Sequence, residues 1–503
     1  MSEQTTSEST VSPLRSIVDG ASIFLVGEIL YKASGFVLNF LLARTLGSTL
    51  YGIYTYAYTY ITVSTMFASL GSDQAVLRYF PSYSDDEDAQ SWIAGISVLS
   101  SVIGSCVVAG MLWVLAPTIR WYTGNSELFV DVMRIIAIML PFDTLTKMLA
   151  SMFRGLEHPT EQIFLQKIVR PGARICAVGV ALLLGYTLID TVAALVVASV
   201  LAFVIGVVLL VRRTSLRPSF SGMSGTASTP EITAYYNYSL PLMLSKAGTI
   251  LYNRVDVFMV GLLIGMSSTG YYNIAFLMSS AITLPLTGCN QLFAPIASRL
   301  YDNGEVDELN EIYATVTRWA FTLALFAALG AIVYAPDILS LIDDEYTVAV
   351  PVLSLFAVGQ LLNASVGPSN YLLMMTDHQY VTFVNHWVFG VVNVVLNFIF
   401  ILQFGLIGAA LATASILGLL NVVRWIEIRY LEGLSPYSRA FYKPLVAGVG
   451  ATGALYLPTL WLSEIPLLVV GGSLGAVVYG LILYALGIEQ SDITFARQMI
   501  ESR

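Results

Sequence analysis

The chain has 503 residues, of which 56% are apolar and only 11% are charged, and its formal net charge is −9. Because a soluble domain typically carries about 25% charged residues, this composition excludes an ordinary soluble protein and is typical of a polytopic membrane protein. The sequence has no GxxxxGK[ST] loop, no HExxH and no Cys/His metal spacing, so it predicts no enzyme, no catalytic residue, no metal site and no cofactor.

Long apolar runs, such as 96–116 and 192–211, predict helices that cross a membrane. The strands of a membrane barrel are shorter, about 10 residues, and alternate throughout. We therefore expect an all-α protein with fourteen transmembrane helices near 17–43, 51–70, 92–116, 129–150, 163–186, 190–211, 236–263, 269–293, 311–335, 346–366, 379–402, 405–428, 440–459 and 465–486.

The distribution of basic residues predicts the orientation of these helices. With the N-terminus in the cytoplasm, thirteen Lys and Arg residues fall on the cytoplasmic side and only Arg44 and Arg120 fall outside, as the positive-inside rule requires. The polar residues 1–14 do not have the pattern of a signal peptide. We expect a multi-pass protein of the plasma (inner) membrane with both termini in the cytoplasm.

Two segments of the chain repeat one another. Residues 41–60 align with 259–278 at an offset of 218, which pairs Gly47 with Gly265 and Gly52 with Gly270. A second match, of 185–199 with 403–415, has nearly the same offset. Because six predicted helices separate the copies, both copies have the same orientation and are related by an axis along the membrane normal.

The repeat predicts the domain organisation. We expect two six-helix lobes and two additional C-terminal helices. The expected segments are a polar tail (1–16), an N-terminal lobe (17–211), a cytoplasmic linker (212–235), a C-terminal lobe (236–428), helices thirteen and fourteen (429–486) and a second tail (487–503).

Polar residues form a stripe on the first helix of each lobe, where a charge near mid-bilayer costs about 2.5–3.5 kcal/mol. If the two stripes face each other, they line a central cavity that attracts anions. Alternatively, Glu28 with Lys32 and Arg254 with Asp256 neutralise each other as structural pairs. The stripes contain Glu28, Lys32 and Asn39 in helix one, and Lys246, Asn253, Arg254 and Asp256 in helix seven.

Helices four and five carry further charges. Asp143 and Lys147 are spaced as an i,i+4 pair, and we expect them to contact each other. Lys167 and Arg170 are expected to extend to the cytoplasmic headgroups. Arg174 lies about one turn deeper and is a further candidate for the cavity wall.

Tyrosines mark the second helix of each lobe. Tyr54 and Tyr58 share one helix face, and the repeat aligns Tyr272 with Tyr54. These rings either belong to an interfacial belt and pack internally, or form a wall on which sugars or acyl chains stack.

A resemblance to a known family rests on the order of four stretches: LLARTLGSTLYGIYTYAYTY (41–60), SLGSDQAVLRYF (69–80), RVDVFMVGLLIGMSSTGYYNIAFLM (254–278) and NVVLNFIFILQFGLIGAALATA (393–414). They resemble the Wzx-type polysaccharide and O-antigen flippases of the multidrug/oligosaccharidyl-lipid/polysaccharide (MOP) exporter superfamily. The resemblance implies two lobes that alternate around a cavity. Such proteins move a polyprenyl- or dolichyl-linked glycan to the outer leaflet.

The resemblance also implies roles for single residues. The basic residue of the family's first helix matches Lys32, and its charged pair in helix seven matches Arg254 and Asp256. Glu28 beside Lys32 departs from that pattern. We expect Na⁺ or H⁺ coupling to use a carboxylate, for which Glu28, Asp256 and Asp143 are the candidates. The expected partners are the lipid-linked glycan, membrane lipids and a glycosyltransferase or polymerase of the same pathway, with no nucleic acid.

Three alternatives remain at this point. A drug/cation antiporter of the same superfamily would have carboxylates dominating its cavity. A membrane glycosyltransferase would need an external acidic pair such as Asp343 and Asp344. A non-transporting scaffold of a glycan-assembly complex would tolerate the loss of Lys32 and Arg254.

Overall fold

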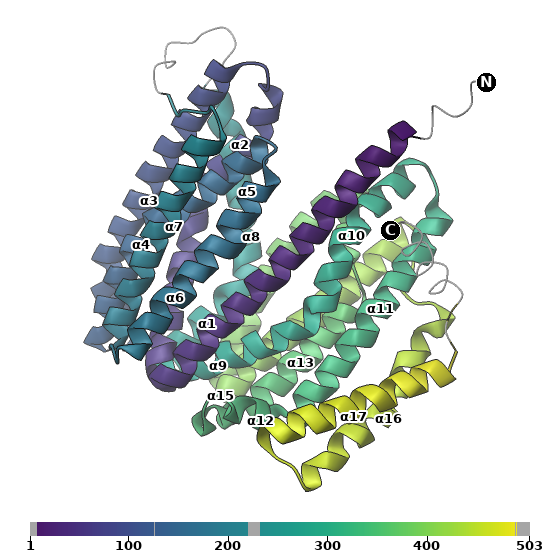
Figure 1. Cartoon of the computed structure of the whole chain (residues 1–503). Coiled ribbons are helices and arrows are strands. Elements are labelled where there is room, and N and C mark those ends of the chain that lie inside the picture. Colours follow the sequence, from purple (N-terminus) through teal and green to yellow (C-terminus); the bar gives the residue numbers. More distant parts are fainter. Residues whose placement is uncertain (1–7, 125, 220–231, 488, 490–503) are drawn as a thin grey trace, which may run out of the picture. The chain divides into compact units, whose positions relative to one another are not determined.

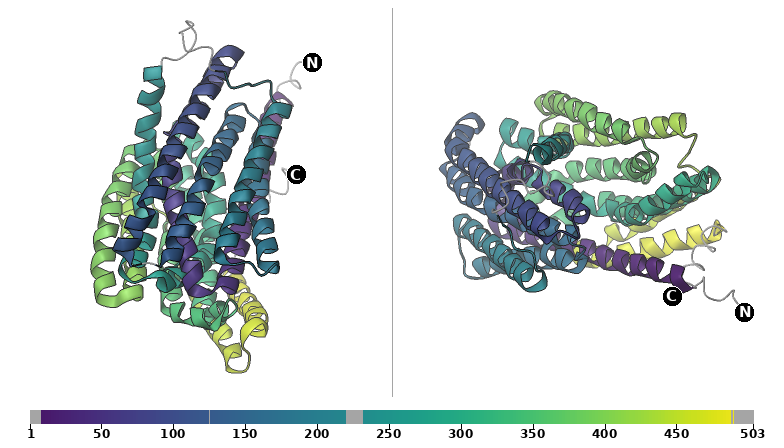
Figure 2. Two further views of the ribbon diagram at one scale, coloured as in Figure 1. Left: turned by 90° about the vertical axis from the view of Figure 1, so that its left-hand side faces the viewer. Right: turned by 90° about the horizontal axis from the view of Figure 1, so that it is seen from above.

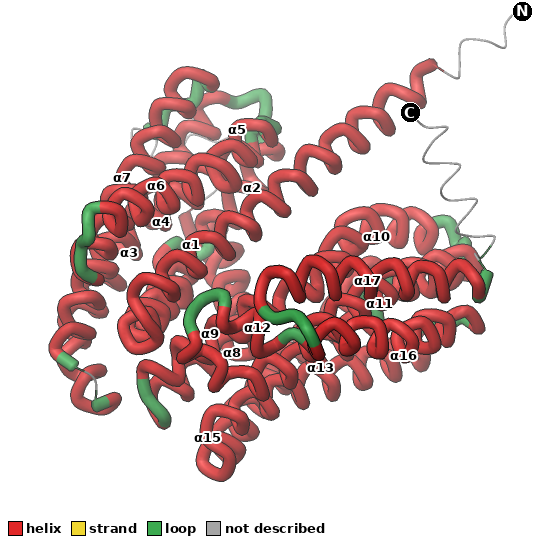
Figure 3. The backbone as a smooth tube through the Cα atoms, turned by 60° about the horizontal axis from the view of Figure 1, so that its bottom comes forward, coloured by secondary structure: helices red, strands yellow, loops and turns green. Residues whose placement is uncertain are grey.

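The computed structural model describes residues 8–124, 126–219, 232–487 and 489 (Figure 1). Among these residues every regular element is a helix, and no strand is present (Figure 3). Seven of the described helices are long and apolar enough to cross a membrane, so the chain is an all-helical, multi-pass membrane protein. The larger count of fourteen spans stays a prediction. The ends of both predicted tails and residues 220–231 of the predicted linker lie outside the described residues.

The chain divides into two compact units. Unit 1 contains Met1–Ile250 and Gly265–Gly270, and unit 2 contains Leu251–Ile264 and Tyr271–Arg503. The helices of unit 1 are α1 (Glu8–Ala68), α2 (Ser72–Ser82), α3 (Glu87–Thr123), α4 (Glu127–Gly155), α5 (Pro159–Ile163), the π-helix η1 (Phe164–Val169), α6 (Arg170–Leu183), α7 (Leu188–Arg213) and the first part of α8 (Ile232–Leu263).

Unit 1 is held together by apolar packing between long helices. Within it α4 packs against both α3 and α7, and these helices run side by side (Figures 1 and 2). Their contact face is rich in large apolar side chains, including Trp92, Met152 and Phe153. Tyr235 of α8 is buried in the same core, and its hydroxyl lies 2.8 Å from the hydroxyl of Ser97.

Unit 2 contains the end of α8 and most of α9 (Met266–Ser280), followed by η2 (Ala281–Thr283), α10 (Leu284–Asp302), α11 (Val306–Val333), α12 (Ala335–Ser340), η3 (Asp344–Ala349), α13 (Val350–Ser365), α14 (Ser369–Met375), α15 (Gln379–Leu431), η4 (Arg439–Phe441), α16 (Tyr442–Tyr456), η5 (Leu457–Leu460) and α17 (Glu464–Ala485). One of its cores joins Phe293, Tyr313 and Ile428 from three of these helices. The hairpin of α16 and α17 packs on α11, where the Tyr479 hydroxyl donates to the Thr322 carbonyl at 2.9 Å.

Two of the longest helices each contain a sharp turn at one glycine. Gly47 in α1 has φ 73° and ψ 170°, and Gly405 in α15 has φ 59° and ψ −133°. Residues with a side chain rarely adopt positive φ. Each glycine therefore reverses the chain where the sequence analysis placed a boundary between two spans. At each of these two boundaries the helical conformation is interrupted at a single residue and not by a longer loop.

Two glycines let the second half of α1 approach the first turn of α9 closely. A Cβ added at Gly52 would lie 1.8 Å from the Met266 carbonyl oxygen, and one added at Gly270 would lie 2.3 Å from the Ser48 carbonyl oxygen. The Thr49 and Ser267 hydroxyls are 2.6 Å apart. All of these residues belong to unit 1, and they meet in the register in which the repeat pairs them.

Candidate functional site

Asp143 is the centre of a buried charge cluster in unit 1. Its side chain is only 3% exposed. One carboxylate oxygen, Oδ2, accepts from Arg170 at 2.9 Å and from Arg174 at 2.6 Å. The other terminal nitrogen of Arg174 donates to the Tyr58 hydroxyl at 2.8 Å. The cluster therefore links α1, α4 and α6 through charge-assisted hydrogen bonds, which are the stronger kind.

The π-helix η1 determines how the arginines reach Asp143. Pro171 stands at the start of α6 and has no backbone N–H, so a regular α-helical hydrogen bond cannot form there. The chain takes the wider turn of a π-helix over Phe164–Val169 instead, a form that is frequent at functional sites. Arg170 and Arg174 follow directly on one face of α6. Among the described residues, the Nε atoms of both arginines have no hydrogen-bond partner.

Lys147 extends the positive charge of this cluster by one helical turn of α4. Its ammonium donates to the Thr65 hydroxyl at 2.9 Å, and Asp73 lies within electrostatic range. Asp143 and Lys147 attract each other electrostatically, as the i,i+4 spacing predicts, but the hydrogen bonds of the Asp143 carboxylate come from elsewhere. Asp143 bonds to arginines of another helix, because the packing of α4 turns its carboxylate toward α6.

A second ion pair lies at the start of the described side chains of α1. Lys167 donates to Glu28 at 2.5 Å, and its ammonium lies 4.5 Å from the centre of the Tyr31 ring. The prediction that Lys167 and Arg170 extend to the headgroups is wrong, since both bond to carboxylates inside the helix bundle. Lys32 is half-buried and within electrostatic range of Glu28 and Lys167.

Asn39 lies further along the same helix. Its side chain donates to the Gly35 carbonyl at 2.8 Å and accepts from the Tyr51 hydroxyl at 2.8 Å. Asn39 therefore braces the two halves of α1 across the turn at Gly47. Lys246 and Asn253, which the sequence places on the stripe of helix seven, have side chains outside the described residues.

Asp256 is the buried carboxylate of unit 2. It is 3% exposed. Its Oδ2 accepts from the Tyr272 hydroxyl at 2.7 Å and from Thr413 at 3.3 Å, while Oδ1 accepts from the Val257 N–H at 2.8 Å. Arg254 is half-buried and acts on Asp256 electrostatically. All three of these hydrogen bonds to the carboxylate come from neutral donors.

A polar cavity of about 210 Å³ opens beside Asp256 within unit 2. Its wall combines amide and hydroxyl side chains with the apolar side chains of Phe276, Ile416 and Leu417, and the guanidinium of Arg424 lies on the same wall. Arg424 is 8% exposed and bonds to Asn370 at 3.1 Å and to His386 at 3.3 Å. The polar side chains of the wall are Asp256, Gln360, Asn363, Asn393, Thr413 and Arg424.

The tyrosines have structural partners in both units. Tyr54 is 3% exposed and stacks on Tyr58 with 5.6 Å between ring centres. Tyr272 is fully buried and lies edge-on to Phe356 at 5.0 Å. This burial favours the packing interpretation over direct stacking on a sugar for Tyr54 and Tyr272. Tyr58 is partly exposed, and it orients Arg174.

Several residues of the unit 2 cavity were missed from the sequence. Three of them are single polar residues within long apolar runs, namely Gln360, Asn363 and Asn393. Their position deep in a span was the only sequence signal that they line a site. Thr413 lies at the end of the second repeat match, in a run of small residues. Because its neighbours are also small, the sequence pattern did not mark the Thr413 hydroxyl as part of a site.

Helices with membrane-spanning length, buried ion clusters and an internal polar cavity define a multi-pass membrane transporter. The family model described as "Polysaccharide biosynthesis protein" matches residues 17–301, and the MatE model matches residues 241–399. Since the first match covers more than half of the chain, the chain belongs to the polysaccharide biosynthesis protein family. This confirms the predicted flippase family of the MOP superfamily.

Curated relatives agree with the family. An uncharacterized membrane protein of Methanocaldococcus jannaschii is 20% identical over 79% of this chain and 80% of its own. The probable flippase AglR of Haloferax volcanii is 28% identical over 50% and 54% of the two chains. The probable low-salt glycan biosynthesis flippase Agl15 of the same organism is 25% identical over 36% and 38%. The chain thus spans about half or less of the two flippases.

Solved structures show the same fold. The lipid II flippase MurJ in an inward closed conformation matches 94% of this chain and 99% of its own, with a TM-score of 0.73 and 14% identity. An inward-facing multidrug resistance MATE family transporter of the MOP superfamily matches 80% and 94%, with a TM-score of 0.66 and 14% identity. The fold is that of MOP transporters, and the relatives are flippases and transporters rather than enzymes.

Proposed function

We propose that this protein is a flippase. It carries an oligosaccharide linked to polyprenyl or dolichyl (pyro)phosphate from the cytoplasmic to the outer leaflet of the plasma membrane, for polysaccharide or glycoprotein biosynthesis. Transport proceeds by alternating access of two lobes, both termini are cytoplasmic, and a coupling cation binds at Asp256. A glycosyltransferase or polymerase of the same pathway is the expected protein partner.

The local excess of cations in the two charge clusters of unit 1 is the observation that carries this proposal. In the two charge clusters, whose members lie on α1, α2, α4, η1 and α6, five cations accompany three carboxylates. Buried charges are normally matched, because an uncompensated ion in a low-dielectric interior is costly. A surplus of cations favours an anionic ligand that supplies the missing negative charge, as a phosphate does. The cations are Lys32, Lys147, Lys167, Arg170 and Arg174, and the carboxylates are Glu28, Asp73 and Asp143.

The sidedness of lipid-linked glycans in cells without this protein tests the transport step. We expect a cytoplasm-facing lipid-linked glycan to accumulate, protected from an added external glycosidase and detected by mass spectrometry. Wild-type protein should restore exposure. Arg174→Gln combined with Lys32→Gln should not, because the variant loses two cations.

Arg120→Gln is the matched control for that experiment. Arg120 is 40% exposed and pairs with Glu127 at 3.2 Å, so its loss should leave transport unchanged. Comparable amounts of each variant in the membrane must be verified. An unchanged glycan pool in the deletion strain, with normal surface glycans, would refute the flippase.

Asp256 is our candidate for ion coupling, and its surroundings support that role. The cavity beside Asp256 offers amide and hydroxyl oxygens, which suit Na⁺, and a buried carboxylate that suits H⁺. Binding there is expected to favour one conformation over the other, because a ligand shifts an equilibrium only through its different affinity for the two states. Asp143 is a weaker candidate, since two arginines already neutralise it.

Asp256→Asn should abolish the dependence of transport on an ion gradient in proteoliposomes. Asparagine has nearly the same shape as aspartate and retains one acceptor for Tyr272, so the fold should survive. Imposed Na⁺ and pH gradients identify the ion. Asp337→Asn is the control, because Asp337 accepts from the Glu464 N–H at 2.9 Å, outside the cavity. Full gradient dependence in Asp256→Asn would exclude this residue.

A drug/cation antiporter is the second candidate, and the match of the MatE model to residues 241–399 favours it. An antiporter would recognise its cationic cargo through carboxylates, whereas the two charge clusters of unit 1 contain five cations and three carboxylates. Efflux of cationic dyes from cells that express the protein separates the two functions. Efflux lost in Asp256→Asn, together with unaltered lipid-linked glycans in the deletion strain, would favour the antiporter.

A further inference from the structure

Two of the three histidines in the chain occupy the same kind of turn. His158 lies between α4 and α5, and His378 lies between α14 and α15. In both turns the preceding residue has a positive φ, 60° at Glu157 and 63° at Asp377, and the histidine N–H donates to a carbonyl five residues earlier at 2.8 Å. Under the predicted topology both turns are on the cytoplasmic side, so each unit presents a histidine there in the same backbone conformation.

In unit 2 the histidine joins the ends of several helices. The Nδ1 atom of His378 lies 3.3 Å from Oε1 of Glu432, the residue that follows α15. The hydroxyl of Tyr301, in the last turn of α10, donates to the same oxygen at 3.3 Å. His158 differs, because its partner Glu161, at 3.6 Å, belongs to the first turn of the short helix α5.

The surroundings of Glu432 favour a positive charge on its partner. Its side chain is only 10% exposed, and a carboxylate at the C-terminal end of a helix is disfavoured by the helix dipole. Removing such a group from water is costly unless it is paired. A protonated imidazole supplies a charge, whereas a neutral one supplies at most a hydrogen bond. Histidine changes its charge between about pH 5 and 8, so the strength of this pair depends on pH.

The other charged groups on the packed elements do not share this property. Arginine and acidic side chains ordinarily titrate outside that pH range. Burial, and then the Glu432 carboxylate, raise the pKa of Tyr301 above its usual value, so Tyr301 stays protonated. Glu427 accepts instead from Asn385 at 2.7 Å. The charged groups are Arg299 and Asp302 of α10, Glu305, Asp307, Glu308 and Glu311 at the start of α11, Asp377 in the turn, and Glu427 and Arg429 of α15.

We propose that Tyr301, His378 and Glu432 form a pH-dependent clamp on the cytoplasmic ends of α10 and α15. With His378 protonated, the ion pair joins the turn before α15 to the end of that helix, and Tyr301 joins α10 to both. As the pH rises His378 loses its proton, and only the Tyr301 hydrogen bond and apolar packing remain. The clamp is therefore complete at low pH and weakened at high pH.

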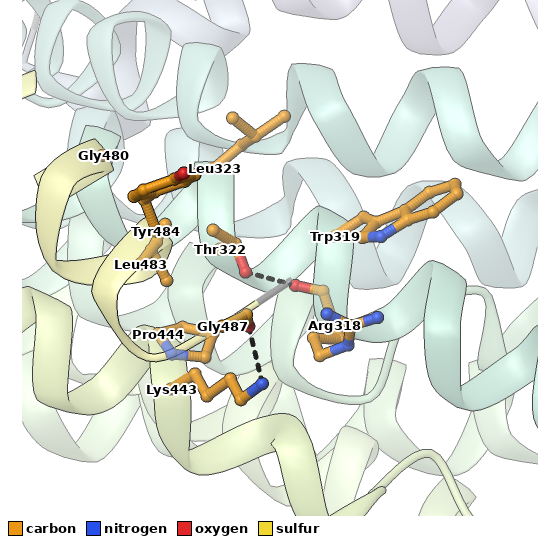
Figure 4. A pocket seen from close by; sticks show the side chains of 10 residues that line it. All are labelled: Arg318, Trp319, Thr322, Leu323, Lys443, Pro444, Gly480, Leu483, Tyr484 and Gly487. Carbon is orange, nitrogen blue, oxygen red and sulfur yellow. Dashed lines mark hydrogen bonds between the residues drawn. The ribbon is translucent and has the colours of Figure 1, made fainter. Parts of the chain in front are cut away.

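The clamp is separate from the other sites of the chain. It includes neither Asp143 nor Asp256, and it shares no residue with the groove of about 500 Å³ that α11 forms with the α16–α17 hairpin (Figure 4). It therefore does not depend on the proposed function. Its physical consequence is that the cytoplasmic pH controls how firmly these helix ends of unit 2 are joined.

The unfolding temperature of the purified full chain, measured near pH 6 and near pH 8, tests the clamp. We expect the wild type to unfold at a higher temperature near pH 6. His378→Gln and Glu432→Gln should each reduce this difference, and the double variant should reduce it no further than either. His158→Gln is the matched control and should leave the difference unchanged, because its pair is local and His158 is 40% exposed. Glu427→Gln should also leave it unchanged. A difference of wild-type size in His378→Gln would overturn the proposal.

A second measurement does not rely on stability. Because the chain has three histidines, the ring signals of isotope-labelled histidine in a nuclear magnetic resonance spectrum can be assigned by single substitutions. In Glu432→Gln the signal of His378 should titrate at a lower pH than in the wild type, since no carboxylate stabilises the imidazolium. Glu161→Gln should move only the signal of His158. An unchanged titration of His378 in Glu432→Gln would show that the two residues do not form the clamp.

Discussion

Replacing Asp143 with alanine is expected to destabilise unit 1 by about 3–5 kcal/mol, the usual cost of removing one partner from a buried ion pair. The carboxylate is 3% exposed and accepts from Arg170 at 2.9 Å and Arg174 at 2.6 Å. Without it, two buried guanidinium groups lose their counter-ion, with Lys147 close by. The helices α4 and α6 would separate to admit water or would not pack at all.

The unfolding temperature of the detergent-solubilised protein measures this effect, read by the loss of the monodisperse peak after heating. Asp190→Ala is the control, because the exposed Asp190 side chain accepts from the Thr187 N–H at the start of α7 and its loss should change the unfolding temperature only slightly. The expectation would be contradicted if Asp143→Ala unfolds at a temperature as high as that of Asp190→Ala.

A triple variant separates the charge effect from a simple loss of packing. Asp143→Leu with Arg170→Met and Arg174→Met replaces the whole cluster by apolar side chains of similar size. Such replacements of buried ion networks are often neutral or stabilising. We expect most of the lost stability to return, while glycan transport remains absent. This result would show that stability requires only that the three side chains pack without an unpaired charge, whereas transport requires the charges themselves.

The membrane class and the helical nature of the chain were predictable from the sequence because hydrophobicity acts residue by residue. A run such as 192–211 has to avoid water whatever its neighbours are. Glycine positions were informative for the same local reason. The turns at Gly47 and Gly405 lie where the sequence analysis separated two spans, although it expected loops rather than one positive-φ residue.

The partners of the buried charges were not predictable, because they depend on how the helices rotate and pack. The spacing of Asp143 and Lys147 permitted a contact within one helix, but the structure joins Asp143 to arginines that are distant in sequence. Position along the chain identifies only which charges lie within or near a span. Only tertiary packing decides which carboxylate each cation meets.

The two clusters share one feature that the sequence analysis did not predict. In each unit a tyrosine of the helix that the repeat pairs bonds to a charged group: Tyr58 to Arg174 and Tyr272 to Asp256. The repeat aligns Tyr272 with Tyr54 and not with Tyr58. The sequence analysis interpreted these rings as a belt or a stacking surface. In both units the hydroxyl group of the tyrosine, rather than its ring face, contacts the charged group.

Gly52→Ala is expected to prevent the close contact of α1 with the first turn of α9, and so to abolish folding or transport. The added Cβ would lie 1.8 Å from the Met266 carbonyl oxygen and 3.1 Å from the Gly270 nitrogen. Both are backbone atoms, which cannot rotate away as a flexible side chain can. Overpacking typically costs about 1–3 kcal/mol, and a clash with backbone belongs at or above the upper end.

Two further variants make this expectation specific to the crossing. Gly270→Ala should have a similar effect, since its Cβ would lie 2.3 Å from the Ser48 carbonyl oxygen. Gly35→Ala, in the same helix α1, meets nothing within 4 Å and should be neutral or slightly stabilising, because alanine favours a helix over glycine by about 1 kcal/mol. The unfolding temperature of each purified variant measures the difference.

A cross-link tests the contact directly, without relying on destabilisation. The Thr49 and Ser267 hydroxyl oxygens are 2.6 Å apart, so Thr49→Cys with Ser267→Cys should form a disulfide in membranes under mild oxidation. A pair that stays reduced, together with a Gly52→Ala variant of normal stability, would show that these helices do not cross here. If the disulfide forms and transport continues, this crossing, in which small residues let two backbones touch, is maintained during transport.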